Sequence, residues 1–344
     1  AKVLILDEPT SVLSPLALQA LFKTLRQLSS EGVSIIFITH KLNEIRELSK
    51  HCTVIRSGEV AANINPQEMT EQELAKLMIG SDIPEIMPRP EIKPHPGLEV
   101  CFQGEEVGFK SRYPLYGKIN VPCGRIVGVA GISGNGQAEL MKAISGEVLL
   151  PKNCISIVGS FAGDLRVKHR RALGLRYVPE QRLGEATVPE MSLESNTLLT
   201  SNLFLAKGFM RNKMIARFTR SIIEKFRVRC GGPKAPAESL SGGNLQKFIV
   251  GRELLHNPKG MILNQPTWGV DAGAATLIRN ALIRQRSGGS AILVVSEELD
   301  ELFEICDELV VMSEGKISPQ VKTKDVSVEE IGRWMSGLWP EVKD

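Results

Sequence analysis

The sequence has few of the groups that build disulfide frameworks, zinc sites or membrane spans. Its six cysteines are scattered without a C-x-x-C pair, and its five histidines form no metal-ligand cluster with them. These observations argue against a disulfide framework or a zinc site and suit a reducing cytosol. No apolar run approaches the length of about 20 residues that a membrane-spanning helix needs.

Neither sign of charge dominates the chain. Lys and Arg total 42 and Asp and Glu total 39, which leaves a formal net charge of +3 and gives no support to a nucleic-acid partner. The basic run between residues 207 and 220 is interpreted as a solvated helix face. A length of 344 residues with 42% hydrophobic residues predicts two globular domains with substantial cores.

A long internal repeat organises the chain. Residues 3–80 align without a gap with residues 260–337, at a constant offset of 257. The run ILDEPT at 5–10, for example, falls on ILNQPT at 262–267. Each copy reads as strand, helix, strand, helix and strand, which predicts an α/β fold with a parallel sheet.

The repeat also predicts the domain organisation. Residues 81–96 carry five of the 19 prolines and are interpreted as a stiff linker. The first copy opens on an apolar strand, with no initiator Met or signal peptide, and lacks the part that residues 97–259 supply to the second copy. We therefore expect residues 1–80 to be the C-terminal part of one domain, residues 97–344 to be a second domain, and about 160 residues to be missing before Ala1.

Paired carboxylates follow the first apolar strand. Asp7 and Glu8 would lie at the carboxyl edge of a parallel sheet, where α/β proteins bind ligands. An Asp there can hold Mg²⁺, and a Glu can orient and deprotonate an attacking water. The next strand ends in Thr39-His40, which places a further polar group at the same edge. A strand followed by an ordinary surface turn would leave the Asp-Glu-Pro-Thr run unexplained.

A Gly-rich turn lies between a strand and a helix after Arg125. Its backbone N–H groups and the helix N-terminus can hold phosphate oxygens without side chains. The G-x-x-x-x-G-K-[ST] pattern is incomplete, however, because Gln137 replaces the lysine and Ala138 replaces the hydroxyl residue. By itself the turn indicates binding more than catalysis. Its candidate binding residues are Gly131, Ser133, Gly134, Asn135, Gly136, Gln137 and Ala138.

A third element, Ser239 to Lys247, places small residues before an amphipathic helix. Ser241, Gly242 and Gly243 would allow backbone N–H groups to approach a phosphate closely at a helix start. Considered alone, the same residues fit a Ser N-cap followed by flexible glycines.

Together these motifs resemble those of ABC ATPases with two nucleotide-binding domains in one polypeptide. Asp7-Glu8 resembles a Walker B motif, His40 the switch histidine, Leu240 to Asn244 the ABC signature, and Gly131 to Ala138 a degenerate Walker A motif. More narrowly, the Gly-Asn-Gly-Gln loop and the Asn that ends the signature resemble the subunits that serve bacterial importers of simple sugars and nucleosides. The resemblance covers the whole chain and implies P-loop NTPase domains, with a helical subdomain at about residues 185–239.

The two copies differ in their chemistry. Asp7 aligns with Asn264, Glu8 with Gln265, and His40 with Glu297, so the second copy has lost the carboxylates and the histidine. General-base catalysis contributes roughly 10²–10⁴-fold, and losing phosphate-clamping charge adds to that deficit. The second domain's own ATP site is therefore expected to be close to inert.

The resemblance implies a head-to-tail pairing of the two domains. One competent site would then combine Asp7, Glu8 and His40 with the signature residues Ser241, Gly242 and Gly243, using ATP with Mg²⁺ on Asp7. The other site would be degenerate. The implied partners are integral-membrane permease subunits and, indirectly, a periplasmic or lipoprotein substrate-binding protein, at the cytoplasmic face of the bacterial inner membrane. The fragment alone is expected to be inactive.

The resemblance implies roles for three further positions. Glu180 stands nearest the glutamine of the loop that joins the core to the helical subdomain, and Asp271 matches a loop residue that crosses the dimer interface. Phe109 or Tyr113 would stack on adenine, although a buried core aromatic fits either position as well.

Two other functions stay open on the sequence alone. One is a soluble tandem ABC protein acting on ribosomes, which the short proline-rich linker and the degraded second site disfavour. The other is an inactive truncated remnant. The cargo is not determined, because pentose, hexose, nucleoside and riboflavin systems share this kind of subunit.

Overall fold

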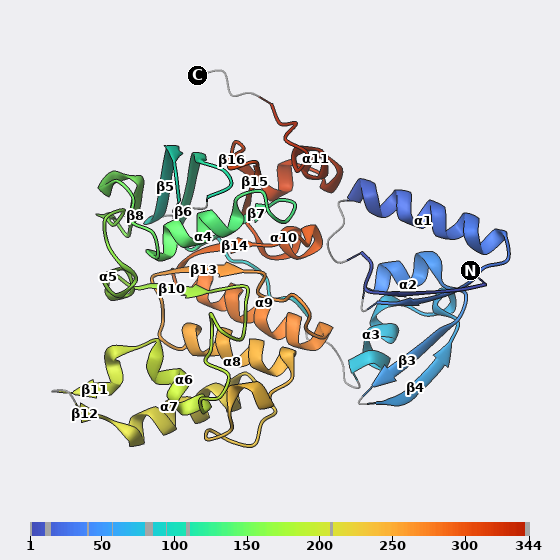
Figure 1. Cartoon of the computed structure of the whole chain (residues 1–344), viewed down its shortest axis with the longest axis horizontal. Helices are drawn as coiled ribbons and strands as arrows, with labels where there is room; N and C mark the ends of the chain where they lie inside the picture. The colour runs from blue at the N-terminus through green and yellow to red at the C-terminus, as the bar shows by residue number, and fades with distance from the viewer. Residues whose placement is uncertain are drawn as a thin grey trace. The chain divides into compact units, whose positions relative to one another are not determined.

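The computed structural model describes two compact units, which Figure 1 labels by helix and strand. One comprises Ala1–Ile86 with Asp271–Thr276, and the other comprises Met87–Val270 with Leu277–Asp344. The described residues are 2–10, 15–39, 41–56, 58–79, 85–93, 95–107, 111–206 and 209–340.

The first unit contains a two-stranded parallel sheet, in which β1 (Val3–Asp7) pairs with β2 (Ser34–Ile38). A helix connects the two strands, and a second helix, an antiparallel hairpin and a third helix follow. Their bounds are α1 (Pro15–Ser30), α2 (Leu42–Leu48), β3 (Cys52–Arg56), β4 (Glu59–Ile64), the 3-10 turn η1 (Pro66–Glu68) and α3 (Glu71–Ile79). Phe22, Leu25, Ile45, Val54 and Leu74 form its buried core.

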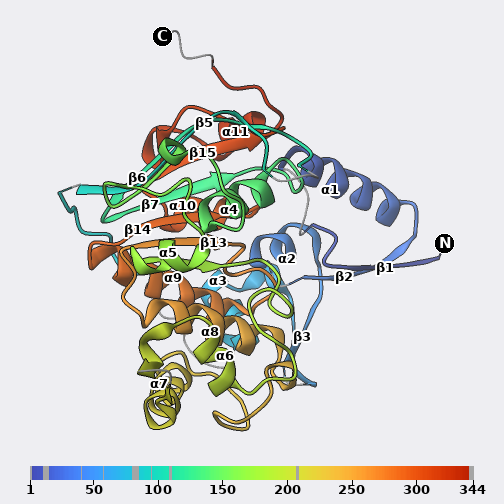
Figure 2. The ribbon, with the colours of Figure 1, turned by 60° about the vertical axis from the view of Figure 1, so that its left-hand side comes forward.

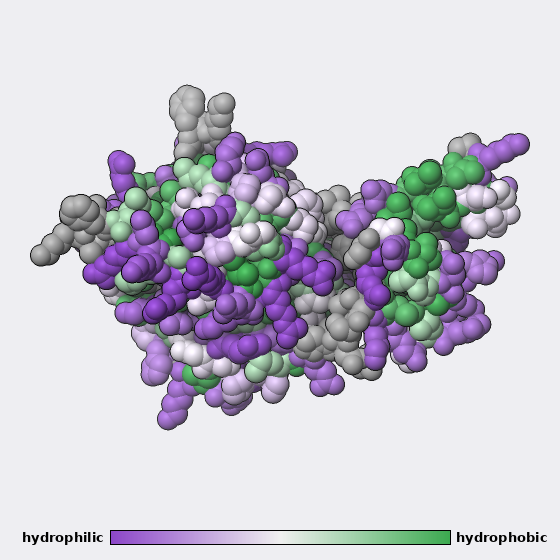
Figure 3. Space-filling model, turned by 90° about the horizontal axis from the view of Figure 1, so that it is seen from below, coloured by the Kyte–Doolittle hydropathy of each residue, from purple (hydrophilic) through white to green (hydrophobic). Residues whose placement is uncertain are grey.

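One face of the β1–β2 sheet is exposed although it is apolar. Val3, Ile5, Ile36 and Ile38 are 47–63% exposed, whereas the residues that alternate with them are half-buried. A parallel strand that is apolar on both sides is normally covered on both faces. Figure 3 shows hydrophobic residues gathered on the surface of this unit, at the right of the view.

The second unit is built on a parallel sheet. Its parallel strands are β10 (Leu175–Val178), β13 (Gly260–Asn264), β14 (Ala291–Val295), β7 (Arg125–Ala130) and β15 (Glu308–Ser313), in that spatial order. Strands β13 and β14 are buried at every position, as expected for a sheet that is covered on both faces. The α/β fold class is therefore confirmed.

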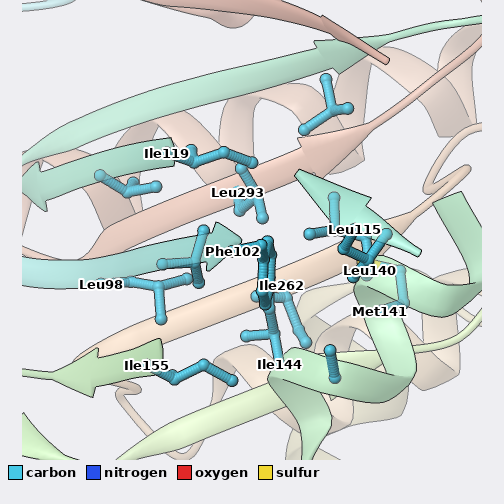
Figure 4. Packing of buried hydrophobic residues seen from close by; sticks show 14 of the residues in the cluster. Leu98, Phe102, Leu115, Ile119, Leu140, Met141, Ile144, Ile155, Ile262 and Leu293 are labelled. Carbon is cyan, nitrogen blue, oxygen red and sulfur yellow. The ribbon is translucent and has the colours of Figure 1, made fainter. Parts of the chain in front are cut away.

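An antiparallel layer covers one side of this core. Its antiparallel strands are β5 (His95–Glu105), β6 (Leu115–Cys123), β8 (Ile155–Ile157) and β9 (Ser160–Phe161). Strand β16 (Lys316–Ile317) lies between β15 and β6, antiparallel to β15 and parallel to β6, and β17 (Val321–Lys322) pairs with β15. Figure 4 shows Phe102 at the centre of the resulting core, next to Ile262 and close to Leu115 and Leu140. This packing joins the antiparallel layer, the parallel sheet and α4 (Gln137–Ser145).

The remaining helices lie around the sheet and in a helical lobe. In Figures 1 and 2, α8 (Gly242–Leu254) and α9 (Ala272–Ser287) lie on the other side of the strands from α4, and the lobe with α6 (Leu193–Leu199) and α7 (Asn212–Lys225) lies beyond α8. Shorter elements complete the unit. They are η2 (Lys152–Cys154), α5 (Val167–Ala172), η3 (Asn202–Phe204), β11 (Leu205–Ala206), β12 (Phe209–Met210), η4 (Ala237–Ser239), α10 (Leu299–Ile305), η5 (Thr323–Asp325) and α11 (Val328–Trp334).

Part of the proline-rich segment packs within the second unit. The backbone N–H of Met87 donates to Asn280 Oδ1 at 2.7 Å, and the Pro90 carbonyl accepts from Arg286 Nη1 at 2.6 Å. Arg89 donates to the Cys306 carbonyl. Residues 87–93 therefore belong structurally to the second unit, although they have no regular secondary structure.

The sequence repeat is also a structural repeat. The bounds of β1, α1, β2 and α2 each recur 257 residues later as the bounds of β13, α9, β14 and α10. Burial differs between the copies, because Ile5 is 63% exposed whereas its counterpart Ile262 is 0% exposed. The two copies therefore have the same secondary structure but differ in the residues that pack against them.

Candidate nucleotide site

Loops that follow four parallel strands meet at one edge of the second unit's sheet. The Gly-rich loop follows β7, and Asn264 ends β13 with Gln265 directly after it. Glu297 follows β14, and Glu180 follows β10. The carboxyl edge of a parallel sheet is where α/β proteins bind ligands.

Glycines give the loop after β7 its shape. Gly136 precedes α4 with a φ of 110°, and Gly134 has a φ of 82°, which are values that side chains rarely tolerate. A Cβ at Gly136 would lie 2.8 Å from Met312 Cε. Asn135 holds the loop from within, since its Nδ2 donates to the Ile132 carbonyl at 3.0 Å and its Oδ1 accepts from Glu314 N–H at 3.0 Å.

Gln137 folds back across this loop. Its Oε1 accepts the Asn135 N–H at 2.9 Å, and its Nε2 donates to the Ile132 carbonyl at 2.9 Å. The side chain is only 8% exposed. The carboxamide oxygen of Gln137 therefore takes up the Asn135 N–H, a backbone donor of the kind that binds phosphate oxygens in such loops. Ala138, which follows, offers no hydroxyl to a metal ion.

Amides and carboxylates line the neighbouring strand ends. Asn264 Nδ2 donates to Glu180 Oε2 at 3.1 Å, and the Glu297 N–H lies 3.4 Å from Gln265 Oε1. Burial raises the pKa of the Glu297 carboxyl, and the negative charge of Glu180 raises it further, whereas hydrogen bonds from Ser133 and Gln265 lower it. Asn264 directs its amide donor at a carboxylate, so these residues do not fit a Mg²⁺ site.

The first copy places its carboxylates at the end of β1. Asp7 and Glu8 are both exposed. Glu8 has a φ of 43°, and its backbone N–H donates to the Ile38 carbonyl at 2.9 Å. Gln265, at the same place in the second copy, has a φ of 51°, and its N–H donates to the Val295 carbonyl at 2.8 Å. A left-handed residue at the same place in both copies is strained backbone of the kind found at functional sites.

His40 and Phe109 lie outside the described residues, and their roles remain predictions. Thr39, which precedes His40, donates from Oγ1 to Glu44 Oε2 at 2.7 Å. Asp271 accepts the Ala274 N–H on Oδ1 at 2.9 Å and so caps the start of α9.

The signature residues lie at the start of α8. Ser241 is the N-cap residue and is exposed together with Gly242, and Gly243 is half-buried. The Ser241 hydroxyl accepts from Asn244 Nδ2 at 2.9 Å and makes no capping bond to the helix. The backbone N–H groups at this helix start therefore lie near an open surface where an anion can approach.

Two arginines near these motifs were not identified from the sequence. Arg182 donates from Nε to Gln246 Oε1 at 3.0 Å and also to the Trp268 carbonyl, so it links α8 to the loop after β13. Arg112 lies 3.9 Å from the position of a Cβ on Gly134. No motif marks either arginine, because each acts on residues distant in the chain.

The structure contains no preassembled metal centre among its described residues. No group of three or more His, Cys, Asp or Glu side chains there could hold a metal ion. The exposed carboxylate of Asp7 nevertheless fits a site where Mg²⁺ is held by one protein carboxylate together with substrate phosphates. In the part of the chain that is described, no helix is long and apolar enough to cross a membrane.

A phosphate-type loop, a helix-start signature and a helical lobe on a parallel sheet define a nucleotide-binding ATPase fold. The sequence profile of the family described as "ABC transporter" matches residues 117–268. A nucleoside import ATP-binding protein of Lactococcus lactis is 38% identical over 344 residues, which cover 98% of this chain and 67% of the relative. A guanosine import ATP-binding protein of Bacillus subtilis is 35% identical, with 98% and 67% covered.

Other relatives and solved structures agree. A ribose import ATP-binding protein of Chelativorans sp. is 33% identical, with 96% of this chain and 65% of the relative covered. The solved ATP-binding subunit of an ABC transporter matches with a TM-score of 0.58 at 21% identity, over 70% of this chain and 99% of that chain. The chain belongs to the family of ABC transporter ATP-binding proteins, which are ATPases. It spans about two thirds of the length of the curated relatives it matches.

Proposed function

We propose that this chain is part of the ATP-hydrolysing subunit that energises a bacterial ABC importer of nucleosides or simple sugars. The relatives named above are import proteins for nucleosides, guanosine and ribose, which supports this range of cargo. The observation that carries the proposal is the chemical difference between the copies: one strand end carries Asp7 and Glu8, and its structural counterpart carries Asn264 and Gln265.

The proposed hydrolytic site uses Asp7, Glu8 and His40 of the first copy with Ser241, Gly242 and Gly243 of the second. Glu8 would orient the attacking water and accept its proton. The N–H groups at the start of α8 would bind phosphate oxygens. Mg²⁺, held by Asp7 together with the ATP phosphates, supplies charge neutralisation when it is bound.

The domain organisation belongs to the same proposal. We infer that residues 1–80 are the C-terminal part of one nucleotide-binding domain, that residues 97–344 are a second one, and that 81–96 connect them. The shared bounds of the repeated elements support this inference. The exposed apolar face of β1–β2 supports it as well, because the corresponding face of β13–β14 is covered by the antiparallel layer and α4.

Permease subunits in the membrane would be the direct partners, and a substrate-binding protein outside the membrane an indirect one. This arrangement would place the subunit at the cytoplasmic face of the bacterial inner membrane. Identifying the binding protein that co-purifies with the membrane complex, and its bound ligand, would name the cargo.

The test is steady-state ATP hydrolysis by the intact protein with its permease. Glu8→Gln should lower the turnover by roughly 10²–10⁴-fold, because it removes the general base. Gln265→Ala, at the same place in the second copy, is the matched control and should leave turnover within about twofold. Full turnover in Glu8→Gln would refute the proposed hydrolytic site.

A further inference from the structure

The helical lobe contains a stretch of sequence that has basic residues and no acidic ones. Between residues 195 and 223 there are five Lys or Arg residues and no Asp or Glu. This stretch includes most of α6, the turn η3, the strands β11 and β12, and most of α7. Figures 1 and 2 show the lobe at the end of the second unit that lies away from the antiparallel layer. Positive charge is therefore concentrated at one end of this unit, although the net charge of the chain is only +3.

Three of these cations form a stripe along the outer face of α7. Lys213, Arg217 and Arg220 have the spacing i, i+4 and i+7, which places them on one side of a helix, and all three are exposed. Ile215 and Ile222, on the other side of α7, are buried. At a rise of about 1.5 Å per residue the stripe is about 10 Å long. Because it lies on the outside of a helix, it can meet a flat surface along its whole length.

The stripe is not neutralised by acidic side chains. Among the described residues, none of its three cations forms an ion pair, whereas the exposed Arg26 pairs with Glu47 at 2.7 Å. The carboxylate of α7, Glu224, is in the last turn of the helix. Neighbouring charges of one sign create a positive potential over the surface, which attracts a partner that carries several negative charges.

Exposed apolar side chains lie next to the stripe. Leu203, Met210 and Met214 are 44–63% exposed. The turn between them is held by the backbone, since the Arg211 N–H donates to the Phe204 carbonyl at 2.8 Å, and Arg211 Nη1 lies 3.6 Å from Met214 Sδ. Phe204 is only 3% exposed and so anchors this turn in the lobe. Cations beside exposed apolar residues are typical of helices that lie on a membrane surface.

A bilayer with anionic headgroups complements both features of the lobe. Its headgroups form a plane of negative charge, and each Lys or Arg near such a plane strengthens binding about fivefold. Leu and Met side chains can enter the boundary between headgroups and acyl chains, where their burial is favourable.

We propose that the outer surface of the helical lobe binds a bilayer that contains anionic lipid. This surface is formed by the three cations of the stripe and the three apolar residues beside it: Lys213, Arg217, Arg220, Leu203, Met210 and Met214. The proposal goes beyond the proposed function, because it requires neither ATP hydrolysis nor a particular cargo. The cations hold the headgroups, and the apolar side chains insert between them.

Co-sedimentation of the full chain with lipid vesicles, without ATP, tests this. The chain should bind vesicles of equal parts phosphatidylcholine and phosphatidylglycerol at least about tenfold more tightly than vesicles of phosphatidylcholine alone. Added salt should weaken the binding, because it screens exposed charges. Lys213→Gln, Arg217→Gln and Arg220→Gln combined should weaken it on the order of 100-fold. Met210→Ser with Met214→Ser should weaken it on the order of tenfold.

Two further variants separate the stripe from net charge and from shape. Lys213→Arg, Arg217→Lys and Arg220→Lys combined keep the charge and should leave the affinity within about twofold. The matched control replaces three exposed lysines outside the lobe by Gln, in β16, β17 and η5, and should change the affinity less than about threefold. These lysines are Lys316, Lys322 and Lys324. Far-UV circular dichroism verifies that each variant is folded.

Three results would overturn the proposal. The first is the absence of binding to the anionic vesicles. The second is equal binding to both kinds of vesicle, which would assign the binding to apolar contacts such as the exposed face of β1–β2. The third is equal weakening by the two sets of Gln substitutions, which would show that only the net charge matters. Since no ATP is present, these results do not depend on the hydrolysis test of Glu8, and either proposal can fail alone.

Discussion

At the scale of single residues, the second unit buries charge in well-bonded pairs. Arg286 is 1% exposed and makes two bonds to Asp307, from Nε to Oδ2 at 3.0 Å and from Nη2 to Oδ1 at 2.8 Å. Asp307 Oδ2 also accepts the Ile126 N–H at 2.8 Å. These bonds tie α9 to β7 and, through Arg286 and Pro90, to the segment after residue 86.

Asp307→Asn should lower the free energy of unfolding of the second unit by about 3 kcal/mol, because it leaves a buried guanidinium without its counter-charge. The matched control is Glu304→Gln, which removes a carboxylate charge 2.7 Å from Arg279 at a half-exposed position and should cost about 0.5 kcal/mol. Urea unfolding followed by tryptophan fluorescence measures both, since Trp268, Trp334 and Trp339 all lie in the second unit. Equal costs would contradict this account of the buried pair.

At the scale of elements, the helical lobe is joined to the end of α8 by an aromatic cluster. His256 stacks on Phe218 of α7 with ring centroids 4.8 Å apart, and Phe204 of η3 lies 6.1 Å away. Among the described residues neither ring nitrogen has a hydrogen-bond partner. Burial lowers the pKa of His256 to about 4, and the positive charge of Arg176 contributes to the lowering.

This pKa predicts acid sensitivity. The unfolded chain takes up a proton on His256 below its ordinary pKa of 6.5, whereas the folded chain does so only near 4. The free energy of unfolding should therefore fall as the pH drops from 6.5 to 4, by roughly 2 kcal/mol after allowance for partial exposure.

His256→Leu should flatten this part of the pH profile, whatever its effect on stability at neutral pH. The same substitution at His169, which is exposed on α5, is the control and should leave the profile unchanged. Urea unfolding curves across this pH range provide the measurement. A profile that is as steep in His256→Leu as in the unaltered chain would contradict the assignment.

At the scale of the whole molecule, the two copies of the repeat differ in what covers them. The exposed residues Ile5, Ile36 and Ile38 correspond to Ile262, Leu293 and Val295, which are at most 3% exposed and belong to the main core. The covering strands β5 and β6 and helix α4 come from residues that precede the second copy in the chain. Whether this face of the two strands is buried therefore depends on packing with residues outside the repeated segment.

Ile5→Asn should leave the unfolding curve within about 0.5 kcal/mol of the unaltered chain and reduce binding of a hydrophobic dye, because Ile5 is exposed. Ile262→Asn, its counterpart in the repeat, should cost about 4 kcal/mol or prevent folding, since it buries an amide without partners. Urea unfolding followed by far-UV circular dichroism, which reports on both units, and dye binding distinguish the two variants. Similar losses in both variants would show that the β1–β2 face is covered in solution.

Much of this architecture could be predicted from the sequence. The alternation of apolar runs and amphipathic stretches predicted the α/β fold, and the offset of 257 residues predicted counterparts whose bounds the structure reproduces. The motif spacing placed a Gly-rich turn between a strand and a helix, and the structure has Gly131 to Gly136 between β7 and α4, with Gln137 and Ala138 already in the helix. Local propensity and strand order suffice for these features.

The sequence by itself determined which residue types stand at each strand end, including the loss of both carboxylates at Asn264 and Gln265, because a repeat in register makes the comparison residue by residue. Only the tertiary structure decided that Gln137 folds back onto its own loop, that Arg112 lies near Gly134 and that Glu297 lies near Gln265. These groups come from distant parts of the chain, and their proximity depends on how β6, β7 and β14 pack. Tertiary packing also decides burial, because strands β13 and β14 are covered on both faces whereas their counterparts β1 and β2 have one exposed apolar face.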